Sequence, residues 1–151
     1  MSKVRKLFVY LLIAIVSVVI SVAFAQTNRF TIEGFVNYTK TGDIYMKLMN
    51  QEQFERDVEG KDPQTPFTLS LKTDSNGSKG KVSFKFIDIP KGIYAISFYQ
   101  DVNDNGKCDM GFMGPKEPWG MYKVKPIFKP VFKKISFELN GDLTNLVLEA
   151  K

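Results

Sequence analysis

From residue 30 to the end of the chain, apolar and polar side chains alternate in short segments separated by turn residues. A period of two is typical of β-strands that bury one face. Gly34 interrupts the apolar face of the first segment, which indicates a bulge or close packing. The spacing predicts an all-β chain folded as an antiparallel sandwich. The seven predicted strands are 30–38, 44–48, 67–71, 82–86, 93–100, 135–139 and 143–149.

Three stretches between these segments break the alternation. Gln51 to Glu59 is polar, but Phe54 and Val58 stand four residues apart, so we expect a turn of helix or a loop that packs through Phe54. Asn140-Gly141 favours a two-residue hairpin turn between the last two strands. Met110 to Pro130 holds four prolines and three glycines. It predicts a long irregular excursion, the kind of segment that often carries function on a rigid scaffold.

The first 25 residues have the three parts of a secretory signal. The start is positive, residues 7–22 are almost entirely apolar, and Ala23-Phe24-Ala25 offers small residues at a cleavage site. The apolar run is short for a bilayer, which takes about 20 residues, so cleavage is favoured over a retained anchor. We therefore expect an N-terminal signal helix within 1–25, one domain over 26–151, and a periplasmic or secreted location. The membrane is contacted only through the signal peptide before cleavage.

Composition excludes several kinds of chemistry. The chain has no histidine, which rules out Ser-His-Asp and Cys-His catalysis and histidine-liganded zinc. Cys108 is the only cysteine, so an internal disulfide is also ruled out, and we expect this thiol to be buried and inert. Cleavage would remove three basic residues and lower the formal net charge from +5 to +2. A nucleic-acid partner is therefore not expected.

The most informative stretch runs from Asp101 to Asp109. Oxygen-bearing side chains stand at its positions 1, 3, 5 and 9, and Gly106 stands at position 6. Alternate residues of a tightly curled loop point inward and glycine permits the sharp turn, so the spacing matches the front half of a calcium loop. The residue at position 7 would contribute its backbone carbonyl. The predicted ligands of Ca²⁺ are Asp101, Asn103, Asn105, Lys107 and Asp109.

The match to a calcium loop is incomplete. Position 12 of a helix-loop-helix site carries a bidentate Glu, and here it is Phe112. Glu117 or water would have to complete the coordination. With two carboxylate ligands we expect weak binding, in the range of about 10⁻⁴ to 10⁻³ M. The alternative is a metal-free turn in which Asp and Asn side chains accept hydrogen bonds from nearby backbone N–H groups.

Two further groups, in the excursion and just after it, have alternative interpretations. Trp119 and Tyr122 would stack on a sugar in a carbohydrate-binding module, or they cover one open end of the sandwich. A run of lysines without an acidic residue would contact an anionic partner, or it forms a solvated edge that prevents strand aggregation. The lysines of this run are Lys123, Lys125, Lys129, Lys133 and Lys134.

Three motifs together resemble the signature of a bacterial exported family known as domain of unknown function 2141. They are Gly92-Ile93-Tyr94-Ala95-Ile96, then Asp101-x-Asn103-x-Asn105-Gly106-Lys107-x-Asp109, then Gly114-Pro115-Lys116-Glu117-Pro118-Trp119-Gly120. The resemblance covers most of the chain after the signal. It implies an immunoglobulin-like or transthyretin-like sandwich in the cell envelope, with no assigned activity. The chain departs from the family pattern after Gly120, where Met121-Tyr122 stands in place of Phe-Ser.

These observations favour a seven-stranded antiparallel Greek-key β-sandwich that acts as a non-enzymatic cell-envelope module. Ca²⁺ would order the 101–109 loop, and the partner would be an envelope protein or a glycan. The alternatives are a carbohydrate-binding module and a carboxylate-based hydrolase of envelope glycans. In the hydrolase, Asp101, Asp109 and Glu117 would supply the acid and the base.

Overall fold

The computed structural model describes residues 28–74, 79–112, 114–123 and 129–150. Of the described residues, 52% are in strands and 11% in helices, so the chain is mostly β, as predicted. The predicted signal peptide over 1–25 lies outside the described residues, and so does Lys125. Within the described part, no helix has the length and apolar character needed to span a membrane.

The described elements follow one another in a simple order along the chain. They are β1 (Arg29–Tyr38), β2 (Asp43–Met49), α2 (Gln51–Val58), β3 (Thr68–Leu71), β4 (Gly80–Pro90), β5 (Gly92–Asp101), β6 (Met110–Gly111), β7 (Gly114–Pro115), β8 (Trp119–Met121), α3 (Phe132–Ile135), β9 (Phe137–Leu139) and β10 (Leu143–Glu149). Each of the seven predicted segments contains a strand. The excursion adds β6, β7 and β8, which alternation did not predict.

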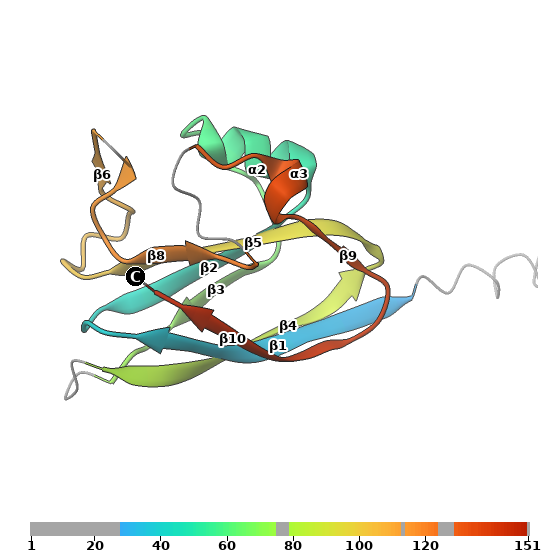
Figure 1. The fold of residues 1–151 in the computed structure, drawn as a ribbon, viewed down its shortest axis with the longest axis horizontal. Helices are drawn as coiled ribbons and strands as arrows, with labels where there is room; N and C mark the ends of the chain where they lie inside the picture. The colour runs from blue at the N-terminus through green and yellow to red at the C-terminus, as the bar shows by residue number, and fades with distance from the viewer. Residues whose placement is uncertain (1–27, 75–78, 113, 124–128, 151) are drawn as a thin grey trace, which may run out of the picture.

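The long strands form two sheets that lie one above the other (Figure 1). The smaller sheet has the order β10-β1-β4. The larger has the order β3-β2-β5-β8, and β9 pairs with the start of β5. β6 and β7 form a separate hairpin above the larger sheet, on the same side as α2 and α3 (Figure 1).

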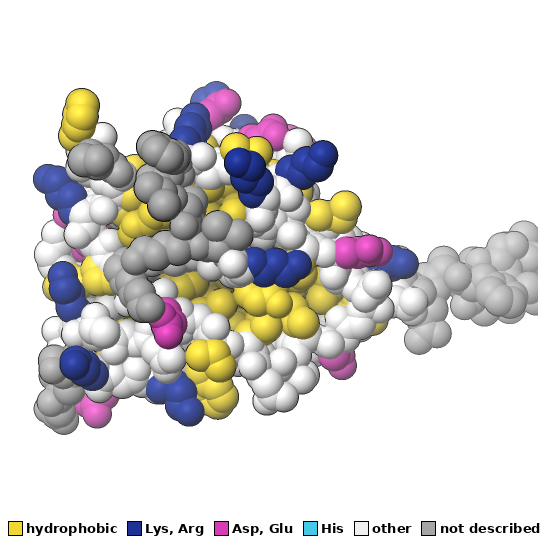
Figure 2. Space-filling view, viewed as in Figure 1, with side chains coloured by type: hydrophobic (Ala, Val, Ile, Leu, Met, Phe, Trp, Pro, Cys, Tyr) yellow, Lys and Arg dark blue, Asp and Glu magenta, His cyan; other side chains and the backbone are white. Residues whose placement is uncertain are grey.

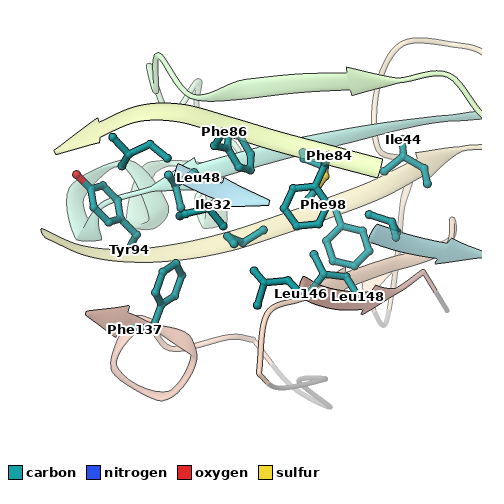
Figure 3. Close-up of a cluster of buried hydrophobic side chains, with 14 of the residues drawn as sticks. Ile32, Ile44, Leu48, Phe84, Phe86, Tyr94, Phe98, Phe137, Leu146 and Leu148 are labelled. Carbon is teal, nitrogen blue, oxygen red and sulfur yellow. The ribbon is translucent and has the colours of Figure 1, made fainter. Parts of the chain in front are cut away.

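Apolar side chains from both sheets meet in one core (Figure 3). Ile32 of β1 and Ile44 and Leu48 of β2 are fully buried there, with Phe84 and Phe98 packed between them. Alternation along each strand puts these residues on one face. The core lies between the two sheets, and it fixes which residues point outward.

A second apolar cluster covers part of the outer face of the larger sheet. Met49 and Ala95 point away from the main core and are buried beneath Phe54 of α2 and Phe132 and Ile135 of α3. The predicted packing of Phe54 is therefore confirmed. Helix α2 begins with a reciprocal capping arrangement that satisfies orphan backbone groups, in which Asn50 and Gln53 each bond the backbone N–H of the other at 3.0 Å.

The bulge or close packing predicted at Gly34 is confirmed. The β1–β10 register shifts between Ile32 and Gly34, and a Cβ on Gly34 would stand 2.2 Å from the Leu146 carbonyl oxygen. Only glycine allows the two backbones to come this close.

Three details of the predicted sheet were wrong. β10 runs parallel to β1, with Ile32 opposite Leu143, rather than antiparallel. Asn140-Gly141 forms no hairpin, because β9 pairs with β5 and β10 with β1, so the chain crosses between sheets at this turn. Asp142 then accepts a hydrogen bond from the Thr31 N–H at 2.8 Å, which helps to align the starts of β1 and β10.

The third detail concerns Ile135. This residue ends α3 instead of beginning a strand, because its side chain packs under α2.

Candidate functional site

The predicted calcium loop begins where β5 leaves the sheet. Tyr94, Ile96 and Phe98 of this strand point into the core, and Gln100 continues their inward register. Asp101 is the last residue of β5 and belongs to the opposite face, yet only 1% of it is exposed. A buried carboxylate requires hydrogen-bond partners, and the loop supplies them.

Asp101 closes the loop through the backbone. Its two carboxylate oxygens accept hydrogen bonds from the Asn105 N–H at 3.1 Å and the Gly106 N–H at 2.7 Å. The chain curls tightly between these points, with positive φ angles of 56° at Asp104 and 76° at Gly106. Asp and Gly are residue types that tolerate this conformation. The sequence predicted the inward direction of Asp101 and the sharp turn at Gly106, and both are observed.

Three of the predicted ligands meet at Asp109. The Asn103 side-chain amide donates to Asp109 Oδ2 at 2.7 Å, and the Asn105 amide donates to the same oxygen at 3.1 Å. The Asn103 bond, followed by the Asn105 bond, lowers the pKa of Asp109, and the nearby Lys107 and Lys116 charges act in the same direction. Asp109 is therefore held as a carboxylate at neutral pH.

Glu117 holds the two ends of the loop together. It is 8% exposed, and its carboxylate accepts hydrogen bonds from the Val102 N–H at 2.9 Å and the Asp109 N–H at 3.1 Å. The Lys116 N–H donates to the Asp109 carbonyl at 2.8 Å, which fixes the return of the chain. The sequence indicates Glu117 only as a metal ligand or an acid, because a contact with backbone N–H groups leaves no signal in residue spacing.

The remaining predicted ligand, Lys107, was expected to act through its carbonyl, and it contacts the loop through its backbone N–H. Its N–H donates to the Asn105 side-chain oxygen at 3.0 Å, and its ammonium group is exposed. Across the described residues, no group of three or more Asp, Glu, Cys or His side chains is arranged to hold a metal ion. A cation in this loop would therefore need the amide oxygens of Asn103 and Asn105, a backbone carbonyl and water.

The carboxylates have features unlike those of a glycosidase pair. Asp101 and Glu117 are buried and accept two backbone N–H groups each. A general acid needs a raised pKa, whereas the pKa of Asp109 is lowered, chiefly by its hydrogen bond from Asn103. The arrangement is suited to holding a loop in shape.

Cys108 lies half-buried beside the larger sheet. Desolvation, with a smaller contribution from the charge of Glu117, raises the pKa of its thiol to about 11. Burial likewise raises the pKa of the nearby Tyr99 phenol to about 12. A thiol with this pKa is almost entirely protonated at neutral pH and is a poor nucleophile.

The two aromatic residues considered for sugar binding are used differently. Tyr122 packs edge-to-face on Phe137, with ring centroids 5.1 Å apart, and is partly buried against the main core. Trp119 stands opposite Tyr99 in the β5–β8 register, and Tyr99 in turn stacks on Tyr45 at 5.3 Å and 22°. The predicted Trp119–Tyr122 pair therefore does not offer two free ring faces.

Gln100 is a buried polar residue that sequence reasoning missed. It is fully buried, and its amide N–H₂ donates to the carbonyl oxygens of Lys40 and Gly42, the latter at 3.2 Å. These bonds tie the end of β5 to the β1–β2 turn. The signal was available, because a glutamine occupies an inward position of an otherwise apolar alternation.

Comparison with known families gives one match. The family model described as "Uncharacterized protein conserved in bacteria (DUF2141)" matches residues 31–146, which include every strand except the first residues of β1 and the last of β10. No curated protein and no solved structure matches the chain. The match spans well over half of the chain, so this protein is a member of the bacterial family DUF2141.

Proposed function

We propose that this protein is an exported, non-enzymatic module of the cell envelope, an immunoglobulin-like or transthyretin-like sandwich whose 101–109 loop binds one calcium ion. The ion acts structurally and holds the loop in the form that meets a partner, either an envelope protein or a glycan. Asp101, Asn103, Asn105, Asp109 and the Lys107 carbonyl are the proposed ligands.

The observation that carries this proposal is the meeting of three side chains, because Asn103 and Asn105 both contact Asp109 Oδ2. Asn103 and Asn105 both direct their amide groups to this oxygen. A half-turn of each amide about its last side-chain bond exchanges nitrogen for oxygen at nearly the same position, and for Asn105 it gives up the hydrogen bond from the Lys107 N–H. The same three side chains would then present oxygens to a shared point, as Ca²⁺ requires.

Asp101 supports the same interpretation. Each of its oxygens accepts one backbone N–H, and a carboxylate has about four lone-pair sites, so acceptor capacity remains for a cation. In calcium loops the first Asp has to be held inward before the ion arrives. Burial and the two backbone contacts hold Asp101 in that way.

Calcium-dependent melting tests the proposal. With a dissociation constant of about 10⁻⁴ to 10⁻³ M, about 10 mM calcium should stabilise the folded chain by about 1–3 kcal/mol, which is a rise of several degrees in melting temperature. Asp109→Asn should abolish the rise. Asp104→Asn is the matched control, because it makes the same charge change in the same loop at an exposed position with no proposed role.

Magnesium at the same concentration should have little effect, because its small octahedral shell fits poorly in a loop built from amide and carbonyl oxygens. An unchanged melting temperature in calcium, or an equal rise for the wild-type chain and Asp109→Asn, would contradict calcium binding by the 101–109 loop. The loop would then be the metal-free turn described above.

A further inference from the structure

The smaller sheet ends on one side at β10, which pairs with β1 alone among the described strands. Directly after β10, the Ala150 N–H donates to the Asn37 carbonyl of β1 at 2.9 Å. Backbone groups alternate in direction along a strand, so Leu148 also faces β1, and the N–H and C=O of Val147 point to the open side. Val147 therefore offers one donor and one acceptor to a further strand.

The open part of this edge is short and centred on Val147. At the C-terminal end of β10, β8 of the other sheet comes close, and a Cβ on Gly120 would stand 2.9 Å from the Glu149 carbonyl oxygen. Near the other end, Asn145 has a φ of 60° and the register with β1 shifts. Regular, accessible backbone lies between these two points.

The other sheet edges have features that prevent pairing between molecules. β4, at the opposite edge of the smaller sheet, has Lys81, Lys85 and Asp88 along it and ends at Pro90. β3, β8 and β9 have four, three and three residues. Charges, proline and short length all hinder the addition of a strand from another chain. β10 has seven residues, and every side chain from Leu143 to Leu148 is uncharged.

The outer face beside this edge is apolar. Val147 is 64% exposed and stands opposite Phe35 of β1, which is 36% exposed. In Figure 2, apolar surface lies on both sides of the course that β10 follows in Figure 1. A strand added at this edge would cover Val147 and extend the apolar row that begins at Phe35.

We propose that β10 pairs antiparallel with β10 of a second copy of this chain, about a two-fold axis at Val147. In that register the Val147 N–H of each copy donates to the Val147 carbonyl of the other, as in a hydrogen-bonded antiparallel pair. The two Val147 side chains lie side by side on the outer face, with a Phe35 ring beyond each.

A second copy fits this edge because the pairing brings no like charges together. Glu149 is the only charged residue of β10, and it falls opposite Asn145 of the other copy. The contact is the same on both sides, so it closes at a dimer and does not extend into a filament. One short strand forms the contact, so we expect a weak dimer with a dissociation constant of about 10⁻⁵ to 10⁻³ M. This inference goes beyond the calcium proposal and does not require it.

Sedimentation velocity in EDTA tests the pairing. The chain from Gln26 onward is the appropriate form, because both apolar clusters lie within it and the preceding apolar segment would itself cause association. The wild-type chain should change from monomer to dimer between about 10 µM and about 1 mM. Val147→Lys should raise the dissociation constant at least about tenfold, because two ammonium groups would meet at the axis.

Ile87→Lys is the matched control. Ile87 is 62% exposed on β4, at the opposite edge of the same sheet, so the same change there should leave the dimer intact.

A mixture of Val147→Lys and Val147→Glu tests the register. Each variant alone should be largely monomeric, and the equimolar mixture should form dimers at least as well as the wild-type chain, because opposite charges would face each other across the axis. Recovery in the mixture requires the two side chains at position 147 to be neighbours, as they are in the two-fold pairing.

A wild-type chain that stays monomeric at about 1 mM would overturn the proposal. Dimers that Val147→Lys leaves intact, or a mixture of the two variants that stays monomeric, would also overturn it. So would larger assemblies in place of dimers, since β10 would then meet a different edge. Dimerisation in EDTA without any calcium-dependent melting would keep the pairing and reject the ion, and the reverse result would reject the pairing alone.

Discussion

Two regions lie over the same side of the larger sheet (Figure 1). They are the helical excursion, formed by α2 and α3, and the 101–117 excursion, and they use their side chains in opposite ways. In the first, α2 and α3 turn their rings inward, so Phe54 is 2% exposed and lies 5.7 Å from the Phe132 ring. In the second, residues 101–117 bury the carboxylates of Asp101 and Glu117 and leave Phe112 in water. The first is held by apolar burial and the second by hydrogen bonds from backbone N–H groups.

This difference indicates a division of roles. Burial of aromatic rings stabilises a fold without specifying a ligand, whereas buried carboxylates cost desolvation free energy and are retained where a particular loop shape is needed. The helical excursion is therefore part of the scaffold. In the proposed function, the 101–117 excursion presents groups to another molecule.

The largest expected effect is on the helical side. Phe54→Ala should lower the free energy of unfolding by about 3–5 kcal/mol, because it leaves a cavity between α2, α3 and the sheet. Phe112→Ala, the same change in the other excursion, should leave stability within about 0.5 kcal/mol of the wild-type value. Urea unfolding measures both variants. Similar losses for the two would contradict the distinction drawn between the excursions.

A smaller effect is expected for the loop carboxylate. Asp101→Asn should lower the free energy of unfolding by about 1–3 kcal/mol, because an amide N–H₂ would face either the Asn105 or the Gly106 N–H. Asp104→Asn, three residues further along the loop and exposed, should cost almost nothing. Equal stability of the two variants in chemical denaturation without calcium would contradict the claim that hydrogen bonds to the Asp101 carboxylate hold the loop.

The smallest effect concerns the thiol of Cys108, which lies within the 101–117 excursion. Because burial raises the pKa of Cys108 to about 11, the protonated thiol favours the folded state. That contribution is fully present below the pKa of an unfolded cysteine and is lost as the pH rises through the folded value. Alkylation by iodoacetamide should thus be slower at pH 8 than for the unfolded chain and should accelerate above about pH 10. Equal rates at pH 8 would show an accessible thiolate.

Much of this arrangement follows from local sequence patterns. Alternation located the strands, the spacing of Phe54 and Val58 located the packed turn of helix, and Asp101 with Gly106 located the curled loop. Each of these depends on residues that are close in sequence. Local patterns are sufficient where the structure is set by local backbone geometry.

The remainder depends on contacts between distant residues. The parallel pairing of β10 with β1 follows from the chain crossing between sheets after Leu139, which alternation does not encode. Glu117 closes the loop by accepting hydrogen bonds from two backbone N–H groups, that of Val102, 15 residues away, and that of Asp109, 8 residues away. The exposure of Phe112 was also unpredictable, because an apolar residue in a Pro- and Gly-rich excursion usually packs on the sheet below it.

Equilibrium dialysis with radioactive calcium tests the central claim most directly. The wild-type chain should bind one calcium ion per molecule with a dissociation constant of about 10⁻⁴ to 10⁻³ M. Asp104→Asn should bind equally, and Asp109→Asn should bind none. Retention of no calcium by the wild-type chain at several millimolar, or an equal amount by Asp109→Asn, would contradict the claim that the 101–109 loop holds the ion.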